Sequence, residues 1–210
     1  MMQTNSISDS VRQYGEAFTR AADILADVTN RDGLIHLFAV HPRCAHLPDA
    51  VFFRGGALAN LNPVYDPALD FAHGAWRSAL CQNLTGLARC ILDYYENIAP
   101  GEALILLADS PSNALFTEAV SWAANAGLSC IAIVPADAEL KEALLLSPCG
   151  ASETEDVKLQ GCAQTLAKLL ASAAGKAQNP PLWSGDNLPD ESDPNNAALI
   201  ERYLSRVKHL

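Results

Sequence analysis

One short loop of the sequence, HPRCAHLPD, carries five side chains that could do chemistry: His41, Arg43, Cys44, His46 and Asp49. An arginine and a histidine together can bind an anion through charge-assisted hydrogen bonds. The loop could also supply metal ligands, but its spacing matches no closed zinc pattern, so a metal site is the least favoured interpretation. The remaining interpretation is an ordinary polar loop.

A second polar segment, ADSPSN, spans residues 108–113 and contains Ser110, Ser112 and Asn113. It follows an apolar run and precedes a helical pattern, and backbone N–H groups at a helix start can hold an anion. Ser110 is expected to be the N-cap of that helix, with Pro111 in its first turn. This segment is the second candidate for ligand binding.

The elements on either side of this segment form the clearest pattern in the chain. Apolar runs at Ala103–Leu107 and Cys130–Val134 are typical of strands buried on both faces. A helix that Gly127 ends lies between them, so the pattern predicts a βαβ unit. Parallel strands imply an open α/β sheet with ligands at the carboxyl ends of its strands.

The rest of the chain predicts a three-layer αβα sandwich around a mostly parallel sheet of about five strands. His36, in an otherwise apolar strand, is expected to be a hydrogen-bonded core residue. Residues 1–210 are expected to form one domain, with a C-terminal extension over 178–210 and an unassigned segment over 71–82. The other expected elements are helices at Ser8–Thr29, Asn83–Asn97, Asp156–Ala174 and Ala197–Val207, strands at Leu34–Ala39 and Ala57–Val64, and a partly helical segment at Asp137–Leu146.

Composition and charge argue against several classes of binding partner. The formal net charge of −10 and the lack of a basic run argue against nucleic acid and anionic membranes. No apolar run is long enough to span a bilayer, and no signal peptide opens the chain. The six cysteines include no CxxC pair, so we expect free thiols, no metal site and a cytoplasmic protein.

The chain resembles SIS (sugar isomerase) domain proteins, in particular the bacterial group similar to phosphoheptose isomerase. Three passages carry the resemblance, IHLF with the following loop and FFRGGALANLNPV, then ILDYYENIAPGEALILLADSPSNALFTEAV, and finally PPLWSGDN with NNAALIERYLSRVKHL. The resemblance implies a homodimer or higher homo-oligomer that binds a sugar or sugar phosphate, with no cofactor.

The resemblance also implies roles for single residues. Asp49 and Glu118 are the carboxylate candidates for proton transfer, and His41 or His46 could move protons during ring opening. Each carboxylate has a structural alternative, Asp49 as a helix cap after Pro48 and Glu118 as a solvated helix residue. Of the family's phosphate loop, only Ser110, Asn113 and the following Glu118 carry over directly.

The chain departs from the family pattern at both loops. The first loop lacks the glycines that let a backbone approach a ligand closely. In the second, Asp109 adds a negative charge where a phosphate would lie, and Pro111 removes one N–H donor. Two functions therefore remain open.

The first is a phosphosugar (aldose–ketose) isomerase whose phosphate contacts come from Arg43, Ser110, Ser112 and Asn113. The second is a non-catalytic binding or regulatory protein that recognises a sugar derivative, including one that carries no phosphate. Replacing Arg43 would separate them, because only the first function needs its charge.

Overall fold

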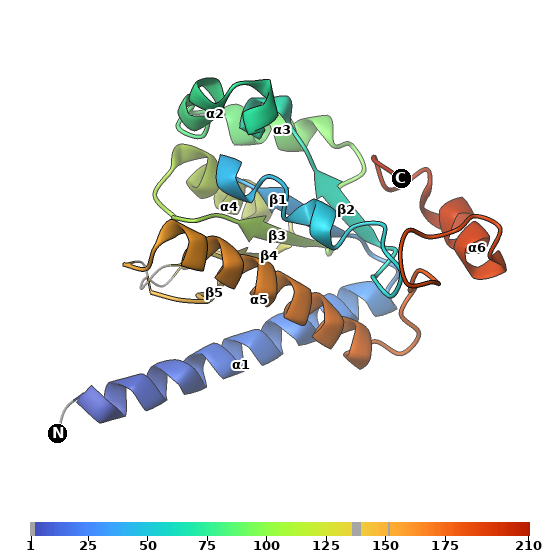
Figure 1. The fold of residues 1–210 in the computed structure, drawn as a ribbon, viewed down its shortest axis with the longest axis horizontal. Helices are drawn as coiled ribbons and strands as arrows, with labels where there is room; N and C mark the ends of the chain where they lie inside the picture. The colour runs from blue at the N-terminus through green and yellow to red at the C-terminus, as the bar shows by residue number, and fades with distance from the viewer. Residues whose placement is uncertain (1–2, 136–139, 151) are drawn as a thin grey trace.

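A single parallel sheet forms the centre of the computed structural model, which describes residues 3–135, 140–150 and 152–210. The strand order is β2-β1-β3-β4-β5, and every neighbouring pair is parallel. The strands are β1 Ile35–Ala39, β2 Leu61–Val64, β3 Ala103–Leu107, β4 Ser129–Ile133 and β5 Leu144–Leu146 (Figure 1). Their near-continuous apolar character follows from burial on both faces.

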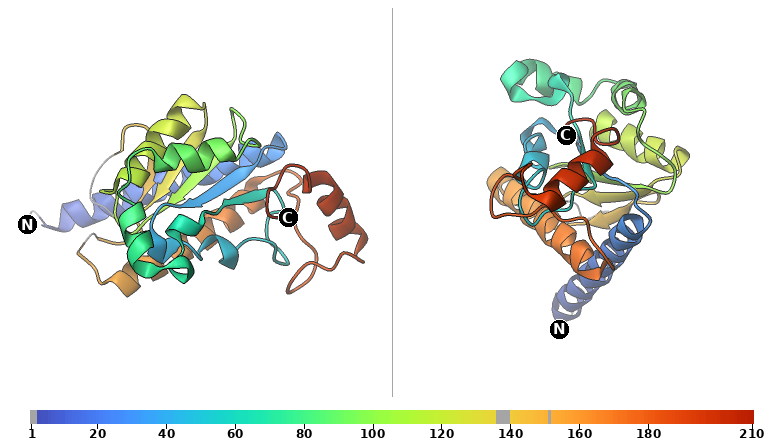
Figure 2. Two further views of the ribbon diagram at one scale, coloured as in Figure 1. Left: turned by 90° about the horizontal axis from the view of Figure 1, so that it is seen from above. Right: turned by 90° about the vertical axis from the view of Figure 1, so that its right-hand side faces the viewer.

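Helices cover both faces of this sheet, which confirms the predicted three-layer αβα sandwich (Figures 1 and 2). On one face, α1 Gln3–Asn30 packs beside α5 Glu155–Lys176, and Leu166 of α5 belongs to the same buried core as Ile105 of β3. On the other face, α3 Leu87–Tyr94 and α4 Ala114–Asn125 pack over Leu104 and Leu106. Successive strand residues alternate between the two layers, so one apolar strand supplies both cores.

The C-terminal segment packs around the amino end of β1. Trp183, Tyr203 and Val207 are buried against Leu34 and Ala59. Helix α6, Pro194–Tyr203, begins at Asp193, whose carboxylate accepts backbone N–H groups of the first turn. The predicted start at Ala197 was therefore wrong by one turn, because Asp193 is the cap and proline fits the first helical position.

Two other expected boundaries also differ from the structure. The strand expected from Ala57 begins only at Leu61, because residues 57–59 instead exchange backbone hydrogen bonds with Pro181 and Trp183. The helix expected from Asn83 begins at Leu87, because Gly86 has a φ of 86° that ends the preceding turn.

Two further segments can now be assigned, the one left open over residues 71–82 and the one expected to be partly helical at Asp137–Leu146. Within residues 71–82 the chain forms a 3₁₀ turn, Phe71–His73, and helix α2, Ala75–Cys81. Leu144–Leu146 is the fifth strand rather than part of a helix, because it pairs with Ile131–Ile133. Residues 137–139, the start of that expected helical segment, lie outside the described residues.

Two predictions about buried polar side chains are confirmed. His36 is fully buried, and its ring nitrogens lie 2.8 Å from Glu102 Oε2 and 2.9 Å from Asn62 Nδ2. All six cysteines are free, and Cys44, Cys130 and Cys162 are buried. His36 is therefore a hydrogen-bonded core residue, and the three buried cysteines are part of the core rather than of a surface site.

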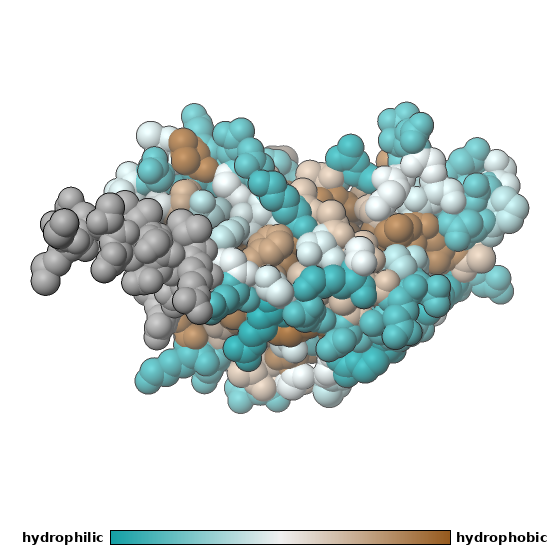
Figure 3. Space-filling view, turned by 90° about the horizontal axis from the view of Figure 1, so that it is seen from below, coloured by the Kyte–Doolittle hydropathy of each residue, from teal (hydrophilic) through white to brown (hydrophobic). Residues whose placement is uncertain are grey.

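Figure 3 shows the underside of the molecule, where apolar side chains form separate patches between hydrophilic ones. The homo-oligomer expected from the sequence stays a prediction. Among the helices of the described residues, none has both the length and the apolar character needed to cross a membrane.

Candidate functional site

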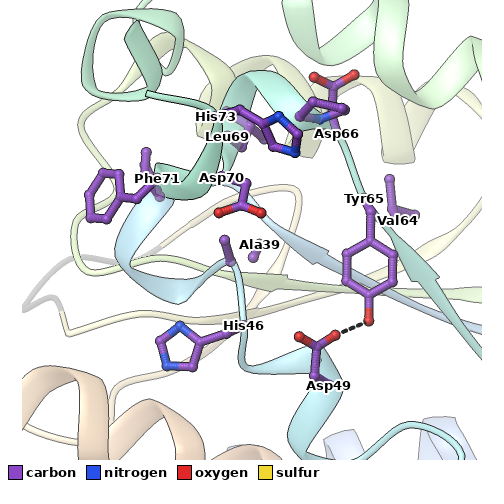
Figure 4. Close-up of a pocket in the computed structure, with 13 residues that line it drawn as sticks. Ala39, His46, Asp49, Val64, Tyr65, Asp66, Leu69, Asp70, Phe71 and His73 are labelled. Carbon is purple, nitrogen blue, oxygen red and sulfur yellow. Dashed lines mark hydrogen bonds between the residues drawn. The ribbon is translucent and has the colours of Figure 1, made fainter. Parts of the chain in front are cut away.

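A cavity of about 400 Å³ opens at the carboxyl ends of β1 and β2 (Figure 4). This edge is where open α/β sheets bind their ligands, and the volume suits a small molecule. Its lining consists of Ala39, Pro42, Ala45, His46, Asp49, Val64, Tyr65, Asp66, Pro67, Leu69, Asp70, Phe71 and His73. We call this cavity the edge pocket.

Three carboxylates line the edge pocket. Asp66 and Asp70 each cap a 3₁₀ turn, since one oxygen of Asp66 accepts Ala68 N–H at 2.7 Å and one oxygen of Asp70 accepts Ala72 N–H at 2.8 Å. Asp49 lies in the turn after Pro48 and accepts a hydrogen bond from the Tyr65 hydroxyl. None of the residues that line the edge pocket is lysine or arginine. The pocket therefore favours hydroxyl or cationic groups over phosphate.

The other polar side chains of the edge pocket come from both strand ends. The Tyr65 hydroxyl points toward Asp49, while His46 and His73 approach from the first loop and from the turn after β2 (Figure 4). Burial, together with the hydrogen bond to Asp49, holds the pKa of Tyr65 well above its usual value. Tyr65 is thus a neutral donor at physiological pH.

A second polar cluster lies at the switch point, the crevice between β1 and β3 where the strand order reverses. His41 Nε2 lies 3.1 Å from Asp109 Oδ1, which joins the loop after β1 to the loop after β3. Glu155, at the first turn of α5, lies 4.0 Å from Arg43 and 3.1 Å from Lys158. Glu155 therefore pairs with both cations of this crevice, while Asp109 contacts His41.

Burial controls the protonation of this switch-point cluster. Desolvation, helped by the nearby Arg43 charge, lowers the pKa of His41 to about 4. Desolvation and a hydrogen bond with Glu155 raise the pKa of Asp109 to about 6. Because His41 Nδ1 accepts the Arg43 backbone N–H, a neutral His41 ring carries its proton on Nε2 and donates it to Asp109.

The polar side chains of the predicted phosphate loop bond mainly to neighbouring residues of the same segment. Ser110 and Ser112 bond to each other through their hydroxyls at 2.8 Å. Asn113, rather than the expected Ser110, is the N-cap of α4, because its side chain accepts Phe116 N–H at 2.7 Å. The amide nitrogen of Asn113 also lies 3.3 Å from Val40 O, so this buried side chain ties the two loops together.

Glu118 lies in α4 and faces the start of α3. Both of its carboxylate oxygens accept the Gly86 N–H, at 2.7 and 2.9 Å. Gly86 is the N-cap residue of α3 and has no side chain of its own to cap that helix. Glu118 therefore supplies the cap from another helix.

The structure separates the predicted site residues into groups. His46 and Asp49 share the edge pocket, whereas His41 and Arg43 belong to the switch-point cluster. In the described residues, no group of three or more histidine, cysteine, aspartate or glutamate side chains is arranged to hold a metal ion.

Sequence reasoning missed four polar residues of the edge pocket, namely Tyr65, Asp66, Asp70 and His73. A signal was present, because the Asp-Pro step at 66–67 directly follows a strand. The carboxyl ends of parallel strands meet at one edge, so residues after β2 must lie beside the loop after β1.

The chain is similar in sequence to proteins of a known family. The family model described as SIS domain matches residues 3–134. A UPF0309 protein of Caldanaerobacter subterraneus is 24% identical over 231 residues, covering 93% of this chain and 92% of its own length. A UPF0309 protein of Listeria monocytogenes is 25% identical over 250 residues, covering 98% and 97%.

A solved structure supports the fold independently. The phosphoheptose isomerase GmhA of Neisseria gonorrhoeae aligns with a TM-score of 0.51 at 14% identity, over 82% of this chain and 96% of that one. The family match extends over more than half of the residues, and the fold agrees with it. The chain therefore belongs to the SIS domain family.

Proposed function

We propose that this protein binds a carbohydrate derivative in the edge pocket, with hydroxyl or amino groups of the ligand facing Asp49, Asp66 and Asp70. The observation that carries the proposal is a pocket lined by three carboxylates and no lysine or arginine. Carboxylates accept hydrogen bonds from sugar hydroxyls and pair with a protonated amine, but they repel phosphate.

The closed switch point supports the same conclusion. An anionic ligand there would have to displace Glu155 from Lys158 and would meet Asp109 directly. Like charges at short range in a half-buried site are unfavourable. The edge pocket, next to this crevice, is already open and needs no such rearrangement.

A phosphosugar isomerase is the second candidate, and two observations favour it. His46 and Asp49 line one pocket, so a proton-transfer pair could act on a sugar bound there. Arg43, in the loop after β1, is half exposed, and Ser110 and Ser112 are exposed in the loop that the family resemblance assigns to phosphate. In this case the sugar lies in the edge pocket and its phosphate reaches toward Arg43.

A thermal-shift panel separates the two candidates. Folded-state ligands raise the melting temperature by mass action, so hexoses, heptoses and amino sugars are compared with their phosphates. The edge-pocket proposal expects stabilisation by unphosphorylated sugars, reduced in Asp49→Asn and retained in Arg43→Ala. Stabilisation by phosphorylated sugars alone, lost in Arg43→Ala, would replace it with the isomerase candidate.

Asp23→Asn is the matched control for Asp49→Asn. Asp23 is an exposed α1 carboxylate that pairs with Lys176 at 2.5 Å, outside the edge pocket. Like Asp49→Asn, the Asp23→Asn variant removes one negative charge from the protein. An equal loss of stabilisation in both variants would show that net charge, and not the pocket, governs binding.

A further inference from the structure

The last residues of the chain lie against Tyr65, the phenol that donates to Asp49 in the edge pocket. The His209 ring meets the Tyr65 ring edge-on, with centroids 5.0 Å apart at 65°. The same imidazole lies 5.9 Å from the ring of Tyr95. One histidine near the carboxyl terminus therefore touches both tyrosines.

Tyr95 holds the backbone of Tyr65 on both sides. Its phenol oxygen accepts Tyr65 N–H at 2.7 Å, and its hydroxyl donates to Tyr65 O at 3.0 Å. His209 Nε2 lies 2.8 Å from the same oxygen. With its one proton given to Tyr65 O, the Tyr95 oxygen accepts from both Tyr65 N–H and His209 Nε2–H.

The terminal residues are anchored well enough to hold this position. Lys208 N–H donates to Asn62 Oδ1 at 3.1 Å, which fixes the segment to β2. The Lys208 ammonium donates to Tyr94 O at 3.0 Å and lies 3.2 Å from the centre of the Tyr94 ring. These two contacts hold the Lys208 side chain against Tyr94.

We propose that His209 is a positioning residue for the edge pocket, which it serves by fixing the Tyr65 ring so that its hydroxyl meets Asp49. The effect on binding rests on the proposed function, whereas the effect on the Tyr65 ring does not. A ring packed on one side by His209 and tethered at its backbone by Tyr95 keeps one orientation. A preorganised donor and acceptor cost less to order when a ligand binds.

The first test needs no ligand. Full-length protein with ¹³C-labelled tyrosine is examined by NMR, and Tyr65→Phe identifies the Tyr65 ring signals. We expect His209→Ala to shift and broaden these signals, and Leu204→Ala, an exposed change in the same C-terminal segment, to leave them in place. Unchanged Tyr65 signals in a folded His209→Ala protein would overturn the proposal.

The second test is a double-mutant cycle with glucosamine as the probe. We expect His209→Ala to weaken glucosamine binding by about threefold to tenfold, and to have less than about a twofold effect in a Tyr65→Phe background, as residues that act through each other require. Equal effects in both backgrounds would overturn the proposal. His209→Phe keeps a ring against Tyr65 and should recover part of the affinity.

The two tests fail separately. If glucosamine does not bind the unaltered protein but the Tyr65 signals respond to His209→Ala, the positioning role stands and the edge-pocket function fails for this probe. If glucosamine binds and the cycle shows no coupling, the function stands and the positioning role fails.

Discussion

His41 and Asp109 meet across the sheet's switch point, with Nε2 of the imidazole 3.1 Å from Oδ1 of the carboxylate. His41 follows β1 and Asp109 follows β3, so this contact joins the two loops that flank the crevice where open α/β sheets bind ligands. Glu155 of α5 completes the closure through Arg43 and Lys158. The open cavity lies one strand away, between β1 and β2.

The burial of His41 and of Asp109 predicts two opposing pH dependences of stability. The pKa of Asp109 is raised from 3.8 to about 6, so its contribution is present below pH 3.8 and is lost as pH rises through 6. The pKa of His41 is lowered from 6.5 to about 4, so its contribution is present above pH 6.5 and is lost as pH falls toward 4. The two slopes oppose each other in the unaltered protein.

Asp109→Asn removes one of these slopes. Between about pH 4 and 6, where Asp109 titrates, its free energy of unfolding should rise with pH more steeply than that of the unaltered protein, by up to about 1.4 kcal/mol per pH unit. Urea denaturation at several pH values in this interval measures the slope. Parallel pH profiles for the two proteins would contradict the account.

Glu118→Ala tests whether Glu118 acts as a helix cap. The variant leaves Gly86 N–H without the carboxylate that accepts it, and should destabilise the protein by about 1 kcal/mol. Glu96→Ala, at an exposed position just beyond α3, is the control and should have little effect. Thermal shift with glucosamine should give the same increment in both variants. Selective loss of that increment in Glu118→Ala would assign Glu118 to the ligand site instead.

Gly55→Ala tests the docking of the C-terminal segment. A Cβ at Gly55 would lie 1.8 Å from Gly185 O, a backbone atom that cannot move aside alone. Overpacking of this kind costs about 1–3 kcal/mol, and chemical denaturation should show a loss of at least that size.

Gly15→Ala is the matched change at a position with free space. A Cβ there would meet no described heavy atom within 4 Å, and Gly15 lies inside α1. Alanine should therefore stabilise the protein by about 0.5–1 kcal/mol through helix propensity. If both glycine variants changed stability in the same direction, the close contact at Gly55 would not explain the result.

The sheet was predictable because its signals are local. The runs predicted at Ala103–Leu107 and Cys130–Val134 are buried on both faces, so composition alone indicates strands there, although β4 begins and ends one residue earlier, at Ser129–Ile133. The fifth strand, Leu144–Leu146, is too short to show periodicity and is defined by pairing with β4. Local sequence cannot report such a pairing.

The candidate site was less predictable because it depends on which loops meet. His46 and Asp49 were identified from the first loop, but their neighbours Asp66 and Asp70 resemble ordinary turn caps in sequence. Ser110 and Asn113 are both good N-caps, and only the tertiary contact of Asn113 with Val40 decides between them. Likewise, nothing near Glu118 in sequence indicates its partner Gly86.

Calorimetric titration with glucosamine and glucosamine 6-phosphate, on the unaltered protein and on Asp49→Asn and Asp23→Asn, tests the central claim most directly. The edge pocket predicts that glucosamine binds more tightly than its phosphate. It also predicts that Asp49→Asn weakens glucosamine binding by about tenfold, as loss of a charge-assisted hydrogen bond does, while Asp23→Asn does not. Tighter binding of the phosphate, or an Asp49→Asn protein that binds glucosamine as well as the unaltered one, would contradict the claim.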